Sequence, residues 1–409
     1  MDFSTLRVRT AWLLLGLPLA ASAGLSFDET TRLAHEQAPA LQAQRSTLDG
    51  AQALLPAAAT LPDPRLIVGL DNLPVTGPDR FSTTADFMTM QRIGVMQEVP
   101  NSAKREARTA AAQARIERDR ALLAVTELAV RRDAGLAWLA VYFAESRAAR
   151  LADLERENQL LQDTLDARIA SGQALPAERT MARIDALMIA DRRDDALRDV
   201  ERARAALRRW VGARGAEPLE GGPPALQVKP EQLRAELHRH AEIAPYDAMQ
   251  AMAWAEAREA DAEQRGDWGW ELVYSRRPQY GDMMSFQLVF DLPWDRERRQ
   301  QPQLMAKQRE AARIQAERAD TLRRHSEEID AQLAELKALD AQHARLERQA
   351  LALNTERVAL ALASYQAGRS DLGAVLMARR EAVETQLRLI DLDAQRAALR
   401  VRLNTLIAE

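Results

Sequence analysis

The stretch "GDWGWELVYSRRPQYGDMMSFQLVFDLPW", from Gly266 to Trp294, decides the fold. The surrounding sequence is rich in alanine and charged residues at helical spacing, whereas here apolar and polar residues alternate. A period of two residues is typical of a β-strand with one apolar face. The stretch therefore predicts a β-hairpin over residues 267–293. The side chains that would share its apolar face are Trp268, Trp270, Leu272 and Tyr274, then Met284, Phe286, Leu288, Phe290 and Leu292.

The same stretch concentrates the aromatic residues. Seven of them lie between Trp268 and Trp294, although aromatics make up only 5% of the chain. Strands of outer-membrane barrels are apolar outside and polar inside, with rings at both membrane interfaces. A soluble hairpin packed on a helix would alternate in the same way, so the pattern alone leaves both interpretations open. The rings predicted to form a membrane belt are Trp268, Trp270, Tyr274, Phe286, Phe290 and Trp294.

A second, weaker hairpin is predicted over residues 65–99. The segments "RLIVGLDNL" (65–73) and "FMTMQRIGVMQEV" (87–99) have the composition of strands, but they hold few rings, and Arg92 interrupts the second one. Four strands cannot close a barrel, and open sheet edges are not tolerated in lipid. A membrane role would therefore require several chains to pool their strands.

Long helices are predicted for most of the remaining chain. Residues 102–171 contain no proline, and a helix over this span would be about 105 Å long. Helices of this length pack side by side, as in coiled coils, and are not typical of globular domains. The sequence "SGQALP" (171–176) ends this helix, and another would continue to about residue 212. The same order of elements is then repeated, with a helix over 302–367, a glycine turn over 365–373 and a last helix to residue 406.

The chain is predicted to be a tandem duplication. The motif "EQAPALQAQ" (36–44) returns as "EIAPYDAMQ" (242–250). An apolar run of about ten residues after a basic start, followed by small residues, predicts a signal peptide, whereas a membrane anchor would need about 20 apolar residues. The predicted division is a signal peptide (1–23), a first repeat (24–211) with the hairpin over 65–99, a linker (212–230) and a second repeat (231–409) with the hairpin over 267–293.

Composition argues against several classes of function. Charged residues make up 28% of the chain and the net charge is −4, so no basic excess indicates nucleic-acid binding. The chain has no cysteine, which excludes disulfides, thiolate metal sites, a cysteine nucleophile and a lipidated N-terminal cysteine. We recognise no catalytic constellation and no phosphate-binding glycine loop. The sequence therefore predicts neither an enzyme nor a cofactor.

A secreted chain with duplicated hairpin and long-helix units resembles the TolC-like outer-membrane efflux factors. The segments "LPDPRLIVGLDNLPV" (61–75), "MTMQRIGVMQEVPNSAKREAR" (88–108) and "YQAGRSDL" (365–372) are similar to its heavy-metal branch, the CusC/CzcC-like proteins. The resemblance implies a mainly α fold with a small β part. Tandem-duplicated long helical hairpins of three chains would form an α-barrel, and four strands per chain would contribute to a twelve-stranded transmembrane β-barrel.

The resemblance also implies a function. The chain would be a passive exit duct for heavy-metal cations (copper/silver or cobalt/zinc/cadmium), in the outer membrane with its helical tunnel in the periplasm. Its partners would be two further copies in a homotrimer, a periplasmic adaptor (membrane fusion protein), an inner-membrane RND-type pump and outer-membrane lipid, without nucleic acid. Alternatives are a soluble periplasmic coiled-coil or adaptor-type protein, and a duct of the same fold for drugs or a secreted protein.

The resemblance places adaptor docking and gating at the two turns between long helices. Arg369 and Asp371 would supply ion pairs that close the channel, whereas ordinary helix connectors would present only solvated charges. The residues assigned to this tip are Gly172, Tyr365, Gly368, Arg369, Asp371 and Leu372.

Metal ligands are weakly indicated. Met88, Met90 and Met96 would share one face of a strand, and thioethers suit Cu(I) or Ag(I). A methionine stripe in a barrel wall more often contacts lipid, so we predict no metal site and keep these three as candidates. His238 and His240 are two residues apart, which makes a poor chelate on a helix, and we expect both at the surface.

Overall fold

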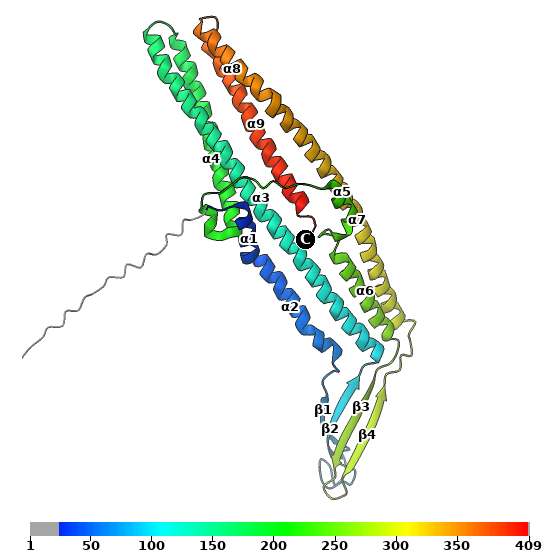
Figure 1. The fold of residues 1–409 in the computed structure, drawn as a ribbon. Helices are drawn as coiled ribbons and strands as arrows, with labels where there is room; N and C mark the ends of the chain where they lie inside the picture. The colour runs from blue at the N-terminus through cyan, green and yellow to red at the C-terminus, as the bar shows by residue number, and fades with distance from the viewer. Residues whose placement is uncertain (1–23, 408–409) are drawn as a thin grey trace, which may run out of the picture.

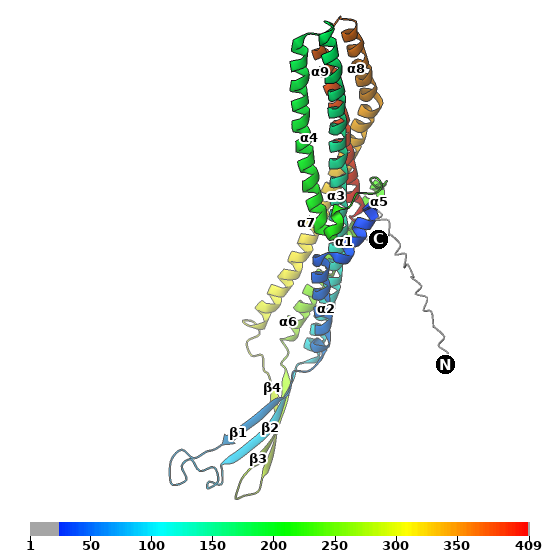
Figure 2. The same cartoon turned by 90° about the vertical axis from the view of Figure 1, so that its left-hand side faces the viewer.

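The structure is a computed structural model that describes residues 24–407. The predicted signal peptide lies outside this part of the chain. Figure 1 shows an elongated molecule with a small β-sheet at one end and long helices along the rest of its length. The turn between α3 and α4 and the turn between α8 and α9 both lie at the end opposite the sheet (Figures 1 and 2). We call these two turns, residues 171–175 and 367–371, the distal tip.

The first half of the chain runs to the sheet, back along the molecule to the distal tip, and returns to the middle. It consists of α1 (Phe27–Gln37), α2 (Pro39–Ala59), β1 (Arg65–Asp71), β2 (Met90–Val99), α3 (Ser102–Ala170), α4 (Pro176–Val211) and a 3₁₀ turn, η1 (Gly212–Ala216). Pro39 begins α2, directly after the break that separates it from α1. Helix α3 is 69 residues long, about 100 Å, and the Asn101 side chain caps it by accepting from the Lys104 N–H.

The second half follows the same order of elements. It consists of α5 (Pro230–Ala235), a 3₁₀ turn η2 (Leu237–Arg239), α6 (Pro245–Ala262), β3 (Trp268–Arg276), β4 (Met283–Phe290), α7 (Gln300–Arg345), η3 (Leu346–Ala350), α8 (Leu351–Gln366) and α9 (Leu372–Asn404). The continuous helix predicted over 302–367 is interrupted, because η3 is a π-helical turn between α7 and α8. The sequence contains no proline or glycine that would have indicated this irregularity.

The four strands form one antiparallel sheet in the order β1-β2-β3-β4. The central pairing joins the two halves of the chain, with Val99 opposite Trp268 and Ile93 opposite Tyr274. Within the second hairpin, Trp268 lies opposite Phe290 and Trp270 opposite Leu288. Opposed residues share a face, so this register collects most of the large apolar side chains of the four strands on the same side, while Ile67, Val273 and Val289 lie on the other.

The helices pack around α3, which contacts α2, α4, α6 and α9. Trp138 on α3 is fully buried, its Nε1 donates to the Leu25 carbonyl at 2.8 Å, and its ring meets Phe27 edge-on. A buried indole combines a large apolar surface with a satisfied polar atom, so this cluster holds α1 against α3 halfway along the molecule.

Within residues 24–407, no helix combines the length and apolar character needed to cross a membrane.

Candidate functional site

The sheet has one apolar face. The apolar face consists of Leu66, Val68, Ile93, Val95, Trp268, Trp270, Leu272, Tyr274, Met284, Phe286, Leu288 and Phe290. Most of these side chains are exposed in the single chain, and Val68 and Phe286 are 72% and 62% exposed. An apolar surface that extends over four strands is larger than the scattered exposed residues of ordinary soluble proteins. It therefore requires an apolar environment or partner.

The other side of the sheet is its polar face. Arg92 lies there, with its guanidinium 2.9 Å from an Asp71 oxygen and 2.8 Å from a Glu271 oxygen. Arg92 therefore does not interrupt the apolar pattern of its strand, because it occupies a position that faces away from the apolar side. The other polar side chains of this face include Ser275, Ser285 and Gln287.

The predicted aromatic belt lies mostly on the apolar face. Trp268, Trp270, Tyr274, Phe286 and Phe290 belong to that face, and Trp294 follows β4 and is 88% exposed. The structure adds a second group of rings at the far loops of the sheet, where Phe87 and Tyr280 lie 6.3 Å apart and Phe81 is also exposed. Phe81 was missed because its Pro-, Gly- and Ser-rich surroundings indicate only a loop, whereas Phe87 was placed at the start of the predicted strand 87–99 and not in the belt.

The three candidate methionines do not form one stripe. Met88 lies in the loop before β2, where its N–H donates to the Asp86 side chain. Met90 and Met96 lie on the polar face of β2, six residues and about 20 Å apart. A single ion cannot bind both of them at that separation.

Each turn of the distal tip contains a glycine in the left-handed conformation. Gly172 and Gly368 have φ values of +75° and +67°. The N–H groups of Gln173 and Arg369 donate back to the carbonyls five residues earlier, at 2.8 Å and 2.9 Å. This is the Schellman helix end, in which glycine takes the left-handed conformation without steric cost. The two turns are therefore equivalent in structure as well as in position.

A polar contact joins the two turns. Tyr365 on α8 is 5% exposed, and its hydroxyl donates to Glu178 on α4 at 2.6 Å. Burial and this hydrogen bond raise the pKa of Tyr365 to about 12. The Arg168 guanidinium lies 4.4 Å from the centre of the Tyr365 ring, which adds a cation–π contact. The apolar residues packed around this contact are Leu165, Ala182, Leu372, Val375 and Leu376.

The residues predicted at the tip therefore have different roles. Tyr365 and Leu372 are buried and hold the turns together, while Arg369 and Asp371 are exposed. The Asp371 carboxylate caps α9 by accepting from the Ala374 N–H at 3.0 Å, and among the described residues Arg369 has no ion-pair partner. The single chain thus contains no Arg369–Asp371 pair. Leu175, in the first turn, is an apolar residue of the tip that we did not predict, and it is 66% exposed.

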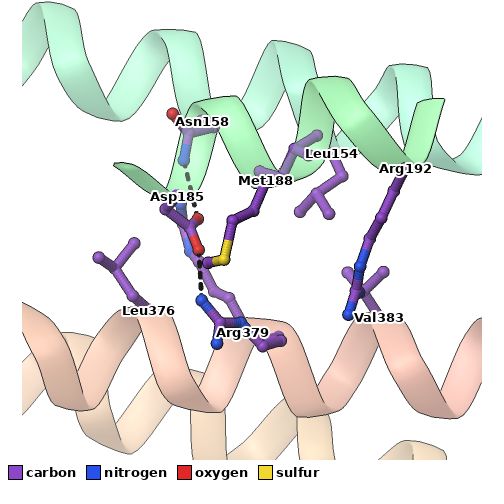
Figure 3. Close-up of a pocket in the computed structure, with 10 residues that line it drawn as sticks. Leu154, Asn158, Asp185, Met188, Arg192, Leu376, Arg379 and Val383 are labelled. Atoms are coloured by element: carbon purple, nitrogen blue, oxygen red, sulfur yellow. Dashed lines mark hydrogen bonds and ion pairs between the residues drawn. The ribbon is translucent and has the colours of Figure 1, made fainter. Parts of the chain in front are cut away.

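A small cavity with both polar and apolar walls lies near the tip, between the helical pair α3–α4 and the helical pair α8–α9. Its volume is about 60 Å³, and it is lined by residues of α3, α4 and α9 (Figure 3). Asp185 accepts from the buried Asn158 side chain at 3.0 Å and from Arg380 at 2.9 Å. A second exposed ion pair, Arg192–Glu384, also joins α4 to α9. These polar contacts link the two halves of the chain beside a buried apolar cluster of Leu154, Ile189 and Val383.

The prediction that both histidines of the H-x-H pair lie at the surface is wrong for His240. This ring is completely buried, and its Nδ1 lies 2.7 Å from Nε2 of His325. Burial, together with the neighbouring His325, lowers the pKa of His240 to about 4, so the ring is neutral at pH 7. The sequence does not reveal this contact, because His325 is 85 residues away in the chain.

The chain is similar to solved membrane channels in fold, while sequence identity is low. It matches CusC, whose structures describe transmembrane channel formation, at a TM-score of 0.81, with 15% identity over 96% of both chains. A membrane protein of Pseudomonas aeruginosa matches at 0.81, with 17% identity over 93% of this chain and 92% of that one. The CmeC outer membrane channel of Campylobacter jejuni matches at 0.77, with 12% identity over 93% and 84%. No family model and no curated protein matches the sequence.

The fold is therefore that of a membrane channel subunit. More narrowly, it is the fold of the TolC-like outer-membrane channels, and the resemblance noted in the sequence is confirmed at the level of the fold. The three similar structures are described as channels or as a membrane protein, and none is described as an enzyme.

Proposed function

We propose that this chain is the outer-membrane component of a tripartite efflux system, a passive duct without enzymatic activity. The observation that carries the proposal is the four-stranded sheet with one apolar face. Strands β1 and β4 are its outer strands, and each has one side unpaired within residues 24–407. A sheet in lipid must close on itself so that no backbone group is left unsatisfied.

A homotrimer meets this requirement. Three copies would place β1 of one chain beside β4 of the next, which closes a twelve-stranded barrel. The apolar faces would contact outer-membrane lipid, and the polar faces, with the Arg92 ion pairs, would line the lumen. Helices α3, α4, α7, α8 and α9 would continue the tube into the periplasm, with the distal tip at its far end. The predicted tandem duplication supports this arrangement, because each repeat supplies one hairpin and one helical pair.

The proposed cargo is a heavy-metal cation. Support comes from the three sequence segments similar to CusC/CzcC-like proteins and from the fold similarity to CusC. The fold does not select the cargo, because the CmeC channel matches at a comparable TM-score. A passive tube has no energy source, so an inner-membrane pump and a periplasmic adaptor would drive export. We propose that the adaptor docks at the distal tip, where Gly172, Leu175, Gly368 and Arg369 are exposed.

The test is the location and assembly of the protein. We expect a heat-modifiable trimer in the outer-membrane fraction, and a deletion strain that is sensitive to metal salts. A monomer released with the soluble periplasm would favour the coiled-coil alternative. A trimer whose loss sensitises cells to drugs, or blocks secretion of a protein, would keep the duct and change its cargo.

A further inference from the structure

A buried histidine faces two carboxylates halfway along the molecule. His325, in the middle of α7, is 3% exposed, and its Nε2 contacts His240. Its other ring nitrogen, Nδ1, is buried without a hydrogen-bond partner in the described part of the chain. The nearest oxygens of Glu242 and Glu328 lie 3.5 Å and 3.9 Å from this nitrogen. The arrangement leaves an unused donor atom in front of two negative charges.

These distances suit the ligands of one metal ion better than hydrogen bonds. A good hydrogen bond to a ring nitrogen ends at about 3.2 Å. Two ligand atoms bound to a tetrahedral ion at about 2.0–2.1 Å lie about 3.4 Å from each other. The candidate ligand atoms of Glu242, His325 and Glu328 all lie within 4.8 Å of one another. Because both carboxylates are about half exposed, small side-chain rotations would bring them around a common centre.

We propose that Glu242, His325 and Glu328 form a binding site for a divalent first-row transition ion, with Zn²⁺ as the best fit. One imidazole and two carboxylates are ligands of Zn²⁺, Co²⁺, Ni²⁺ and Cu²⁺, whereas Cu(I) and Ag(I) prefer sulfur. Three protein ligands leave one tetrahedral position for water. The site is separate from the sheet and from the distal tip, because His325 and Glu328 lie in the middle of α7.

His240 serves as the positioning residue of this site. If the Nε2–H of His325 donates to Nδ1 of His240 across the 2.7 Å contact, the lone pair of His325 Nδ1 is directed at the two carboxylates. A metal-binding histidine usually donates its other N–H to a partner that fixes its orientation. The opposite tautomer would instead place an N–H of His325 against Glu242 at 3.5 Å, which is too long to satisfy a buried donor.

The surroundings of the site favour a cation. Glu242, His325 and Glu328 line a cavity of about 290 Å³, which is also lined by Arg132, Asp133, Gln332 and Arg402. Three carboxylates outnumber two guanidiniums there, and one guanidinium is already paired, since Arg132 lies 2.8 Å from Asp133. The Gln332 side-chain oxygen is buried without a partner among the described residues and offers an acceptor for a metal-bound water.

The ion would fasten the second half of the chain at the middle of the molecule. Glu242 lies in the turn before α6, and in the same turn Ala241 N–H donates to the Leu406 carbonyl at 3.0 Å. His325 and Glu328 lie on the long helix α7. Binding would therefore connect this turn, and through it the segment that follows α9, to α7.

Calorimetry with ZnCl₂ tests the site. The full mature chain is purified in detergent without a polyhistidine tag and stripped of metal with EDTA. We expect one Zn²⁺ per chain, and Co²⁺ should give the visible absorption of a tetrahedral complex. The double variant Glu242→Gln/Glu328→Gln removes two ligands from exposed positions and should lower the affinity at least 100-fold, with normal assembly.

Two matched controls separate this site from other surface groups. Glu327→Gln removes the neighbouring carboxylate on α7 and should leave Zn²⁺ affinity unchanged. His343→Gln should also leave it unchanged, because the His343 ring nitrogens face different carboxylates, Glu347 and Asp393, and cannot converge on one ion. The proposal is overturned if no stoichiometric binding occurs, or if the double variant binds Zn²⁺ as tightly as the parent. Trimer assembly is measured separately, so neither result depends on the proposed duct.

Discussion

The replacement Leu288→Arg tests whether the apolar face of the sheet contacts lipid. Leu288 lies near the middle of β4, opposite Trp270, and is 51% exposed in the single chain. An arginine on the lipid face near the bilayer midplane costs about 2–4 kcal/mol. Three copies in a trimer would cost about 6–12 kcal/mol, which is comparable to the whole stability of a typical folded protein. We therefore expect almost no assembled trimer.

The matched control is Gln287→Arg, one residue earlier on the same strand. Gln287 lies on the polar face, opposite Glu271, so the new charge would face water and a carboxylate. The assay compares unheated and boiled outer-membrane fractions on a denaturing gel, which separates trimer from monomer. Equal trimer abundance for both variants would show that the two faces have the same environment. In that case either the register of the sheet or the membrane assignment would be wrong.

Three further predictions concern the distal tip. Gly368→Val should leave the trimer intact but abolish metal resistance on plates. The left-handed conformation costs a β-branched residue about 1–2 kcal/mol, and the substitution changes the surface of the turn. Normal resistance would make the turn a simple connector. Tyr365→Phe should destabilise the chain by about 1.5–3 kcal/mol in thermal melts, because the buried Glu178 loses a charge-assisted bond. The pKa of Tyr365 is raised to about 12, so its neutral form stabilises the folded chain. This stabilisation should be lost as the pH rises from about 10 through 12. The stability of the Tyr365→Phe variant should not fall in this way over the same pH range. If these charges close the assembled tube, Arg369→Ala and Asp371→Asn should each raise single-channel conductance in a planar bilayer. Asparagine is chosen at position 371 because it can still cap α9. Unchanged conductance would exclude both residues from the gate.

Much of the fold could be predicted because its elements have strong local signals. The alternation in 267–293 specifies a hairpin with one apolar face, and the absence of proline over residues 102–171 allows α3 to form as one helix. Arg92 shows the limit of this approach. As a charge in an apolar segment it weakened the prediction, yet it lies on the polar face between Asp71 and Glu271. Its role became clear only from the register with β1 and β3, which the sequence of one strand does not contain.

The candidate sites were less predictable because they depend on long-range contacts. The glycine turns were located correctly, since positive φ at Gly172 and Gly368 follows from local sequence. The buried roles of Tyr365 and His240 were missed, because their partners Glu178 and His325 are 187 and 85 residues away. Asp371 was assigned to an ion pair, although its position before α9 also suits an N-cap, and the structure shows the cap. A single sequence indicates which residues can pair but not which of them meet.

If the distal tip is a gate, its contacts contribute to the energy needed to open it. If the two helical pairs separate there, the Tyr365–Glu178 bond must break, at a cost of about 1.5–3 kcal/mol for a bond to a charged group. The ion pairs Arg380–Asp185 and Arg192–Glu384 add at most about 1 kcal/mol each, because their arginines are about half exposed. These polar contacts alone amount to about 2–5 kcal/mol per chain, and separating the apolar cluster of Leu165, Ala182, Leu372, Val375 and Leu376 would add to this cost. A partner that binds the separated form more tightly by about 5.5 kcal/mol would reverse a 99:1 population. If the distal tip is the docking site proposed above, a partner must therefore offset both its polar contacts and its apolar packing by binding the separated form more tightly.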